Sequence, residues 1–83
     1  MQIKALPVGA MGTNCYLLED ESTNAAAVVD PGGDAGRILA QLRADGMTVR
    51  AILLTHAHFD HTGAVSELRQ ALPGVPVYLD ESL

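Results

Sequence analysis

The 83-residue chain has one cysteine and only five basic residues. The single cysteine, Cys15, excludes an intramolecular disulfide framework and fits a reducing compartment, so we expect a cytoplasmic protein. No stretch approaches the ~20 apolar residues of a membrane span, and the opening MQIKALPVGAMG does not have the pattern of a signal peptide. The basic residues are scattered over a chain of net charge −5, which is unlike a nucleic-acid-binding surface. We therefore expect neither a membrane nor a nucleic acid as a partner.

What the chain does have is apolar residues, at 48%, which is too many for a disordered acidic tail. Its length allows a single domain over residues 1–83. Glycine and proline separate three candidate strands with the sequences QIKALPV, TNCYLLED and AAAVVD. In the second strand, alternation places Cys15 and Leu17 on one face and Tyr16 and Leu18 on the other. The third is apolar on both faces, as expected of a covered strand.

Helical spacing begins at Asp34, the predicted N-cap of a helix over residues 34–45 that ends at Gly46. The strand RAILLT follows, then a helix over about residues 62–72 that ends before Pro73, and then the strand VPVYLD. The second helix has an apolar stripe formed by Ala64, Val65, Leu68, Ala71 and Leu72. The order β-β-β-α-β-α-β predicts an α/β fold in which the third and fourth strands are interior and the last three are parallel.

All three histidines lie within the segment THAHFDH, directly after the buried strand AILLT. In an extended chain His56, His58 and Asp60 point to one side, and His61 breaks this parity. Neutral imidazoles and a carboxylate are ligands for zinc, iron or manganese. The parity break favours two adjacent metal ions, which can activate water together. A lone histidine is usually an ordinary surface or core residue, but three with an aspartate at this spacing indicate a metal site.

THAHFDH resembles the H-x-H-x-D-H signature of the metallo-β-lactamase fold superfamily, and TNCYLL and VVDPGG resemble the strand and the glycine turn that precede it. The chain looks most similar to the glyoxalase II-like (hydroxyacylglutathione hydrolase-like) branch. The resemblance implies the first half of an αββα sandwich. It implies that His56 and His58 bind a first divalent ion and that Asp60 and His61 bind a second. Zinc is favoured for both ions, with iron or manganese as alternatives.

The resemblance also implies a function, namely hydrolysis of a small acyl thioester such as a hydroxyacylglutathione by a metal-bound hydroxide. Asp60 would be the catalytic residue that orients the hydroxide and accepts its proton. The alternatives are a mononuclear iron sulfur dioxygenase, a nuclease, which the acidic composition disfavours, and an inactive fragment. The family's further ligands include histidines, and no histidine lies outside residues 56–61. We therefore expect an incomplete domain that is inactive alone and that self-associates through an uncovered apolar sheet face.

The sequence leaves the roles of some other residues open. Asp30 supports the metal loop by a hydrogen bond, or it caps the turn of the DPGG segment. Gly32 and Gly33 allow close approach of that turn to the metal loop, or they supply a positive φ. Thr55 holds the loop through its hydroxyl or is an ordinary residue at a strand end. Cys15 is expected to be a buried structural thiol, and Tyr78 is expected to pack in the core.

Overall fold

The computed structural model describes residues 1–10, 12–55 and 63–79, which form five strands and two helices. Their order is the predicted β-β-β-α-β-α-β. The elements are β1 (Gln2–Val8), β2 (Thr13–Asp20), β3 (Ala25–Val29), α1 (Ala35–Ala44), β4 (Thr48–Leu54), α2 (Gly63–Ala71) and β5 (Val77–Leu79). None of the helices in these ranges is long and apolar enough to cross a membrane.

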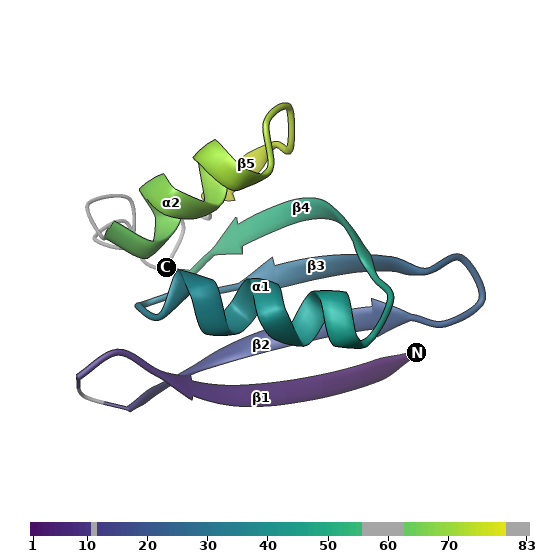
Figure 1. Cartoon of the computed structure of the whole chain (residues 1–83), viewed down its shortest axis with the longest axis horizontal. Coiled ribbons are helices and arrows are strands. Elements are labelled where there is room, and N and C mark those ends of the chain that lie inside the picture. Colours follow the sequence, from purple (N-terminus) through teal and green to yellow (C-terminus); the bar gives the residue numbers. More distant parts are fainter. Residues whose placement is uncertain (11, 56–62, 80–83) are drawn as a thin grey trace.

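The strands form one sheet in the order β1-β2-β3-β4-β5 (Figure 1). The pairs β1–β2 and β2–β3 are antiparallel, whereas β3–β4 and β4–β5 are parallel. β3 and β4 are interior strands, as their apolar sequences predict. Because β1 runs in the same direction as β3, the carboxyl ends of β1, β3 and β4 meet at one edge of the sheet.

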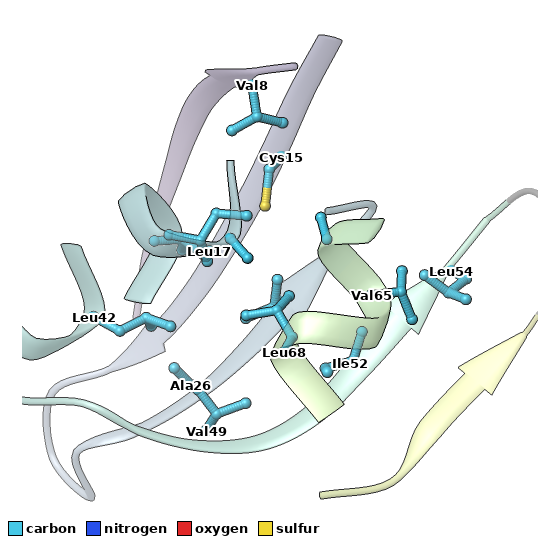
Figure 2. Packing of buried hydrophobic residues seen from close by; sticks show 14 residues of the cluster. Val8, Cys15, Leu17, Ala26, Leu42, Val49, Ile52, Leu54, Val65 and Leu68 are labelled. Atoms are coloured by element: carbon cyan, nitrogen blue, oxygen red, sulfur yellow. The ribbon is translucent and has the colours of Figure 1, made fainter. Parts of the chain in front are cut away.

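Both helices lie on the same face of the sheet, as predicted, and the core fills the space between the two layers (Figure 1). Figure 2 shows Leu17, Ile52 and Leu68 in this layer, and each is fully buried. The alternation predicted for β2 is confirmed, because Cys15 and Leu17 point into the core while Tyr16 is 40% exposed. Burying this many aliphatic side chains, at about 1.5–3 kcal/mol each, is the main stabilising contribution to the two-layer unit.

The first helix begins after Asp34 and ends at Gly46, as predicted, but the Asp34 side chain does not cap it. Gly46 adopts a φ of 69°, and the N–H groups of Gly46 and Met47 donate to the carbonyls of Arg43 and Leu42, which is a Schellman motif. At the other end, Asp34 occupies the N-cap position with a φ of 53° but makes no capping hydrogen bond with its side chain. Its carboxylate is used elsewhere, at the edge of the sheet described below.

The second face of the sheet carries no helix among the described residues (Figure 1). Ile3 is 68% exposed there, and Tyr78 is 57% exposed. The expectation that Tyr78 packs in the core is therefore wrong, because its side chain projects from the short edge strand β5 onto this uncovered face. Ala71, predicted in the buried stripe of α2, is also exposed, because it lines an open cleft where the helix ends.

Candidate active site at the carboxyl ends of the parallel strands

The carboxyl ends of β3 and β4 carry the polar residues that lead into the histidine segment. Asp30 directly follows β3, and Thr55 directly follows β4 and precedes His56 in the sequence. The predicted ligands His56, His58, Asp60 and His61 lie outside the described residues, so their assignment stays a prediction. The geometry described below is that of the strand ends that precede His56 in the sequence.

Asp30 joins the ends of the two strands through both of its carboxylate oxygens. Oδ1 accepts a hydrogen bond from the backbone N–H of Thr55 at 2.7 Å, and Oδ2 accepts one from the Thr55 hydroxyl at 2.6 Å. The Asp30 N–H donates to the carbonyl of Leu53 at 2.9 Å. This is the first of the two roles considered for Asp30, support of the loop after β4. We call the pair the Asp30–Thr55 clamp.

The backbone of Asp30 has a φ of 53°, in the left-handed region that non-glycine residues rarely adopt. Aspartate and asparagine tolerate this region better than other side chains because they can bond locally. Here the left-handed conformation turns the chain at the end of β3 while the carboxylate reaches the end of β4. The direction of the chain at the residue before His56 is thus set by a partner 25 positions earlier.

A second contact at the same edge holds the turn between β1 and β2 against the turn between β3 and α1. A Cβ atom at Gly33 would lie 2.6 Å from the Cα of Gly9, so only glycine fits without a shift. The Gly9 N–H donates to Asp34 Oδ2 at 3.0 Å, and Arg37 Nη1 donates to the carbonyl of Pro7 at 2.7 Å. Close approach is thus the role of Gly33, as considered, but its neighbour is the β1–β2 turn. Sequence reasoning missed this contact, although both turns carry glycine pairs.

Cys15 carries a thiol, a potentially nucleophilic group, and lies in the core beneath this edge. Burial, followed by the negative charge of Asp30, raises the pKa of Cys15 to about 12. Its side chain is fully buried, so it stays a thiol near neutral pH and cannot serve as a nucleophile. The expectation of a structural thiol is confirmed.

One hollow among the described residues lies away from this edge. It has a volume of about 780 Å³ and lies at the opposite end of the molecule, where the carboxyl ends of α1 and α2 diverge. Within residues 1–10, 12–55 and 63–79, no group of three or more His, Cys, Asp or Glu side chains is placed to hold a metal ion. A metal site built on three or more such side chains would therefore include residues outside these ranges, among which is the THAHFDH segment.

Comparison with curated proteins finds relatives over most of the chain. It is 41% identical over 70 residues to hydroxyacylglutathione hydrolase GloC of Haemophilus influenzae, covering 84% of this chain and 32% of the relative. It is 50% identical over 84 aligned positions to a hydroxyacylglutathione hydrolase of Alkalilimnicola ehrlichii, covering 99% of this chain and 32% of the relative. The chain thus spans about a third of the length of the curated relatives it matches.

Comparison with solved structures also finds similar chains. The BLEG-1 B3 metallo-β-lactamase superposes with a TM-score of 0.84 at 43% identity, over 98% of this chain and 38% of that one. TTHA1623 in a di-iron-bound form superposes with a TM-score of 0.77 at 41% identity, over 94% of this chain and 38% of that one. The family model for the metallo-β-lactamase superfamily matches residues 8–83. The chain therefore belongs to the metallo-β-lactamase superfamily, whose members are metal-dependent.

Proposed function

We propose that this chain carries part of the active site of a metal-dependent hydrolase that cleaves a small acyl thioester of the hydroxyacylglutathione kind. The observation that carries the proposal is the 41–50% identity to hydroxyacylglutathione hydrolases over 84–99% of the chain. The geometry supports it, because the Asp30–Thr55 clamp fixes the strand end from which the histidine segment departs. In open α/β sheets, ligands gather at this carboxyl edge.

The donor set fits divalent metal ions. Three imidazoles and one carboxylate within six residues supply nitrogen and oxygen ligands, which suit zinc, iron and manganese. We assign His56 and His58 to one ion and Asp60 and His61 to a second. Such ions supply Lewis acidity and lower the pKa of water. Zinc is our assignment, and the di-iron-bound form of a similar structure makes iron the main competitor.

The residues of the chain have separate tasks in this proposal. Asp60 accepts the proton of the attacking water, a role that requires its ionised carboxylate. Asp30 and Thr55 do not touch the substrate but orient the backbone that leads to His56, as groups outside a ligand set commonly do. The carbonyl of the thioester becomes an oxyanion on attack, which needs positive charge nearby. We assign that positive charge to the metal centre.

The test uses the protein expressed from the complete reading frame that contains this sequence. We expect Asp60→Asn to lower kcat for a hydroxyacylglutathione thioester by about 10² or more, because proton transfer typically contributes 10²–10⁴. His58→Ala should lower the bound metal measured by elemental analysis. Glu67→Gln, at an exposed position on α2, is the matched control and should change neither quantity. A metal-loaded protein that cleaves no thioester in a panel would contradict the proposal.

The second candidate is a mononuclear iron sulfur dioxygenase. Two histidines and a carboxylate are also the ligand set of non-haem iron oxygenases. The two functions differ in metal content and in oxygen consumption. Oxygen uptake with a glutathione persulfide, together with one iron per chain, would favour the dioxygenase over the hydrolase.

A further inference from the structure

The hollow between the carboxyl ends of α1 and α2, which we call the α1–α2 hollow, is lined mainly by apolar side chains. The most buried of these belong to Leu42 and Val49. Four more are half-buried and pack against the core on one side only, namely Leu39, Met47, Leu72 and Val75. The volume of about 780 Å³ lies within the usual range of small-molecule sites, about 300–1,000 Å³. An apolar group in the hollow would therefore complete the burial of these four side chains.

The backbone around the α1–α2 hollow is held by hydrogen bonds on both sides. Where the chain leaves α1, the Met47 N–H donates to the carbonyl of Leu42 at 3.0 Å. Where the chain enters β5, the carbonyl of Pro76 accepts a hydrogen bond from the Ile52 N–H of β4 at 3.0 Å. These bonds join the two walls of the hollow to α1 and to the sheet. The site is thus formed before any ligand binds, which lowers the entropic cost of binding.

The charged residues that line the α1–α2 hollow are all basic. Arg43 and Arg50 are two of only five basic residues in a chain of net charge −5, and both are exposed. No Asp or Glu is among the described residues that line the hollow. The acid nearest to Arg43 in the sequence is Asp45, and its carboxylate accepts a hydrogen bond from Lys4 at 2.8 Å. The hollow therefore combines an apolar lining with positive charge at its border.

We propose that the α1–α2 hollow is a second ligand site, separate from the candidate active site, and that it binds a carboxylic acid with a hydrocarbon chain of medium length. The hydrocarbon chain packs against the apolar lining, and the carboxylate pairs with Arg43 and Arg50 at the border. A guanidinium presents paired N–H donors that match the two oxygens of a carboxylate. The proposal does not depend on the catalytic function.

The place of the hollow in the fold agrees with a ligand site. Both helices lie on one face of the sheet (Figure 1), and in an αββα sandwich the helices form the outer layers. The hollow therefore belongs to an outer layer rather than to the interface between the two sheets. It is also at the end of the molecule opposite to the Asp30–Thr55 clamp, so a ligand there would not compete with a substrate at the carboxyl edge.

Titration with octanoate, followed by NMR of the backbone amides, tests the proposal on the protein expressed from the complete reading frame. We expect the amide resonances of Thr48 and Gly74, which line the hollow, to shift with a saturable dependence on octanoate. Octyl alcohol has the same hydrocarbon chain without the charge. It should bind at least about tenfold more weakly, because it cannot form the charge-assisted hydrogen bonds.

Variants test the two parts of the site separately, and circular dichroism must show that each is folded. Arg43→Gln should weaken octanoate binding about tenfold, because one charged partner of the carboxylate is lost. Ala71→Phe should also weaken it, because Ala71 is exposed and lines the hollow, so a phenyl ring would occupy part of the volume. Arg69→Gln is the matched control, because Arg69 is exposed on α2 and is not among the lining residues.

Three results would overturn the proposal. The first is the absence of saturable shifts at Thr48 and Gly74 up to millimolar octanoate. The second is an equal effect of Arg43→Gln and Arg69→Gln, which would indicate a response to net charge alone. The third is the loss of octanoate binding in His58→Ala together with the metal, which would place the carboxylate at the candidate active site.

Discussion

The two ends of the sheet each hold a carboxylate, half-buried at one end and buried at the other, and the two carboxylates are bonded differently. At the carboxyl end of β3, Asp30 receives hydrogen bonds on both oxygens from Thr55. At the opposite end, Glu19 points into the core from β2 with a side chain only 1% exposed, and its Oε2 has no hydrogen-bond partner. Its neighbours are Lys4, with Nζ 3.6 Å from Oε1, and Asp45, which takes the shorter 2.8 Å contact with the same lysine.

This difference separates a carboxylate that fixes geometry from one that costs stability. A half-buried carboxylate with both oxygens bonded, such as Asp30, specifies the position of its partners. A buried carboxylate with one free oxygen and a second acid nearby loses hydration without full compensation. We therefore expect substitutions at Asp30 to lower the free energy of unfolding throughout the neutral pH range. Substitutions at Glu19 should change it by an amount that depends on pH.

The largest effect is expected for Asp30→Ala. It removes both bonds to Thr55 and places a residue with poor tolerance for a φ of 53° at the end of β3. Together these losses should lower the free energy of unfolding by about 2–4 kcal/mol. In the protein from the complete reading frame, metal affinity should fall about 10–100-fold. Urea denaturation and metal titration measure the two effects.

Asp30→Asn is the matched control for that variant. Asparagine tolerates the left-handed backbone and can accept one of the two bonds through its amide oxygen. We expect less than half of the destabilisation seen for Asp30→Ala. Equal stability of wild type and Asp30→Ala would show that the clamp is not a structural determinant of this edge, and the comparison between the two ends would fail.

A smaller effect is expected for Gly33→Ala, which probes the contact between the two glycine turns. The new Cβ would lie 2.6 Å from Gly9 Cα and 2.9 Å from Gly9 N, so the β1–β2 turn must move. Overpacking of this kind costs about 1–3 kcal/mol. Gly36→Ala is the control, because nothing lies within 4 Å of its Cβ position in α1, and it should stabilise by about 0.5–1 kcal/mol. Two destabilised variants of similar size would contradict the close approach.

The sequence predicted the architecture because its signals are periodic. Alternation assigned the faces of β2, and the change from strand to helical spacing at Asp34 located α1 to within one residue at each end. The contacts at both ends of the sheet were not predictable in this way. Asp30 and Thr55 are 25 positions apart, and Lys4 and Asp45 are 41 apart, so only the folded sheet brings them together.

Burial was predicted wrongly for two side chains, and the physical reason is the same for both. Apolar periodicity records which residues could be buried, whereas burial also requires a neighbour. Ala71 continues the stripe of α2 but faces the cleft beyond the end of the helix. Tyr78 has strand alternation but projects from a three-residue edge strand onto the uncovered face. For the candidate site, the spacing of the histidine segment predicts a metal site, and the assignment of its ligands stays a prediction. The hydrogen bonds of the Asp30–Thr55 clamp could be foreseen only as one of two alternatives for Asp30.

The smallest effect concerns Glu19 and depends on pH. Burial, followed by the proximity of Asp45, raises the pKa of Glu19 above its ordinary value near 4.5. A carboxyl with a raised pKa binds its proton more tightly in the folded state. The free energy of unfolding should therefore fall as pH rises from about 4.5 through the raised pKa. Asp45 acts in the opposite direction, because the hydrogen bond from Lys4 holds its pKa below 3.8 and its contribution is lost as pH falls through that lower value.

Glu19→Gln removes the ionisation while keeping the shape of the side chain. We expect the variant to lose the decline above pH 4.5 and to be as stable as wild type, or up to about 1 kcal/mol more stable, at neutral pH. Glu21→Gln, at an exposed position in the β2–β3 turn, serves as the control for removing one negative charge. Urea denaturation from pH 4 to 8 gives the slopes. If Glu19→Gln keeps the wild-type slope, or if Glu21→Gln abolishes it as well, net charge rather than the buried carboxylate would govern the pH dependence. The proposed difference between Asp30 and Glu19 would then fail, because ionisation of the buried Glu19 carboxylate would not affect the free energy of unfolding.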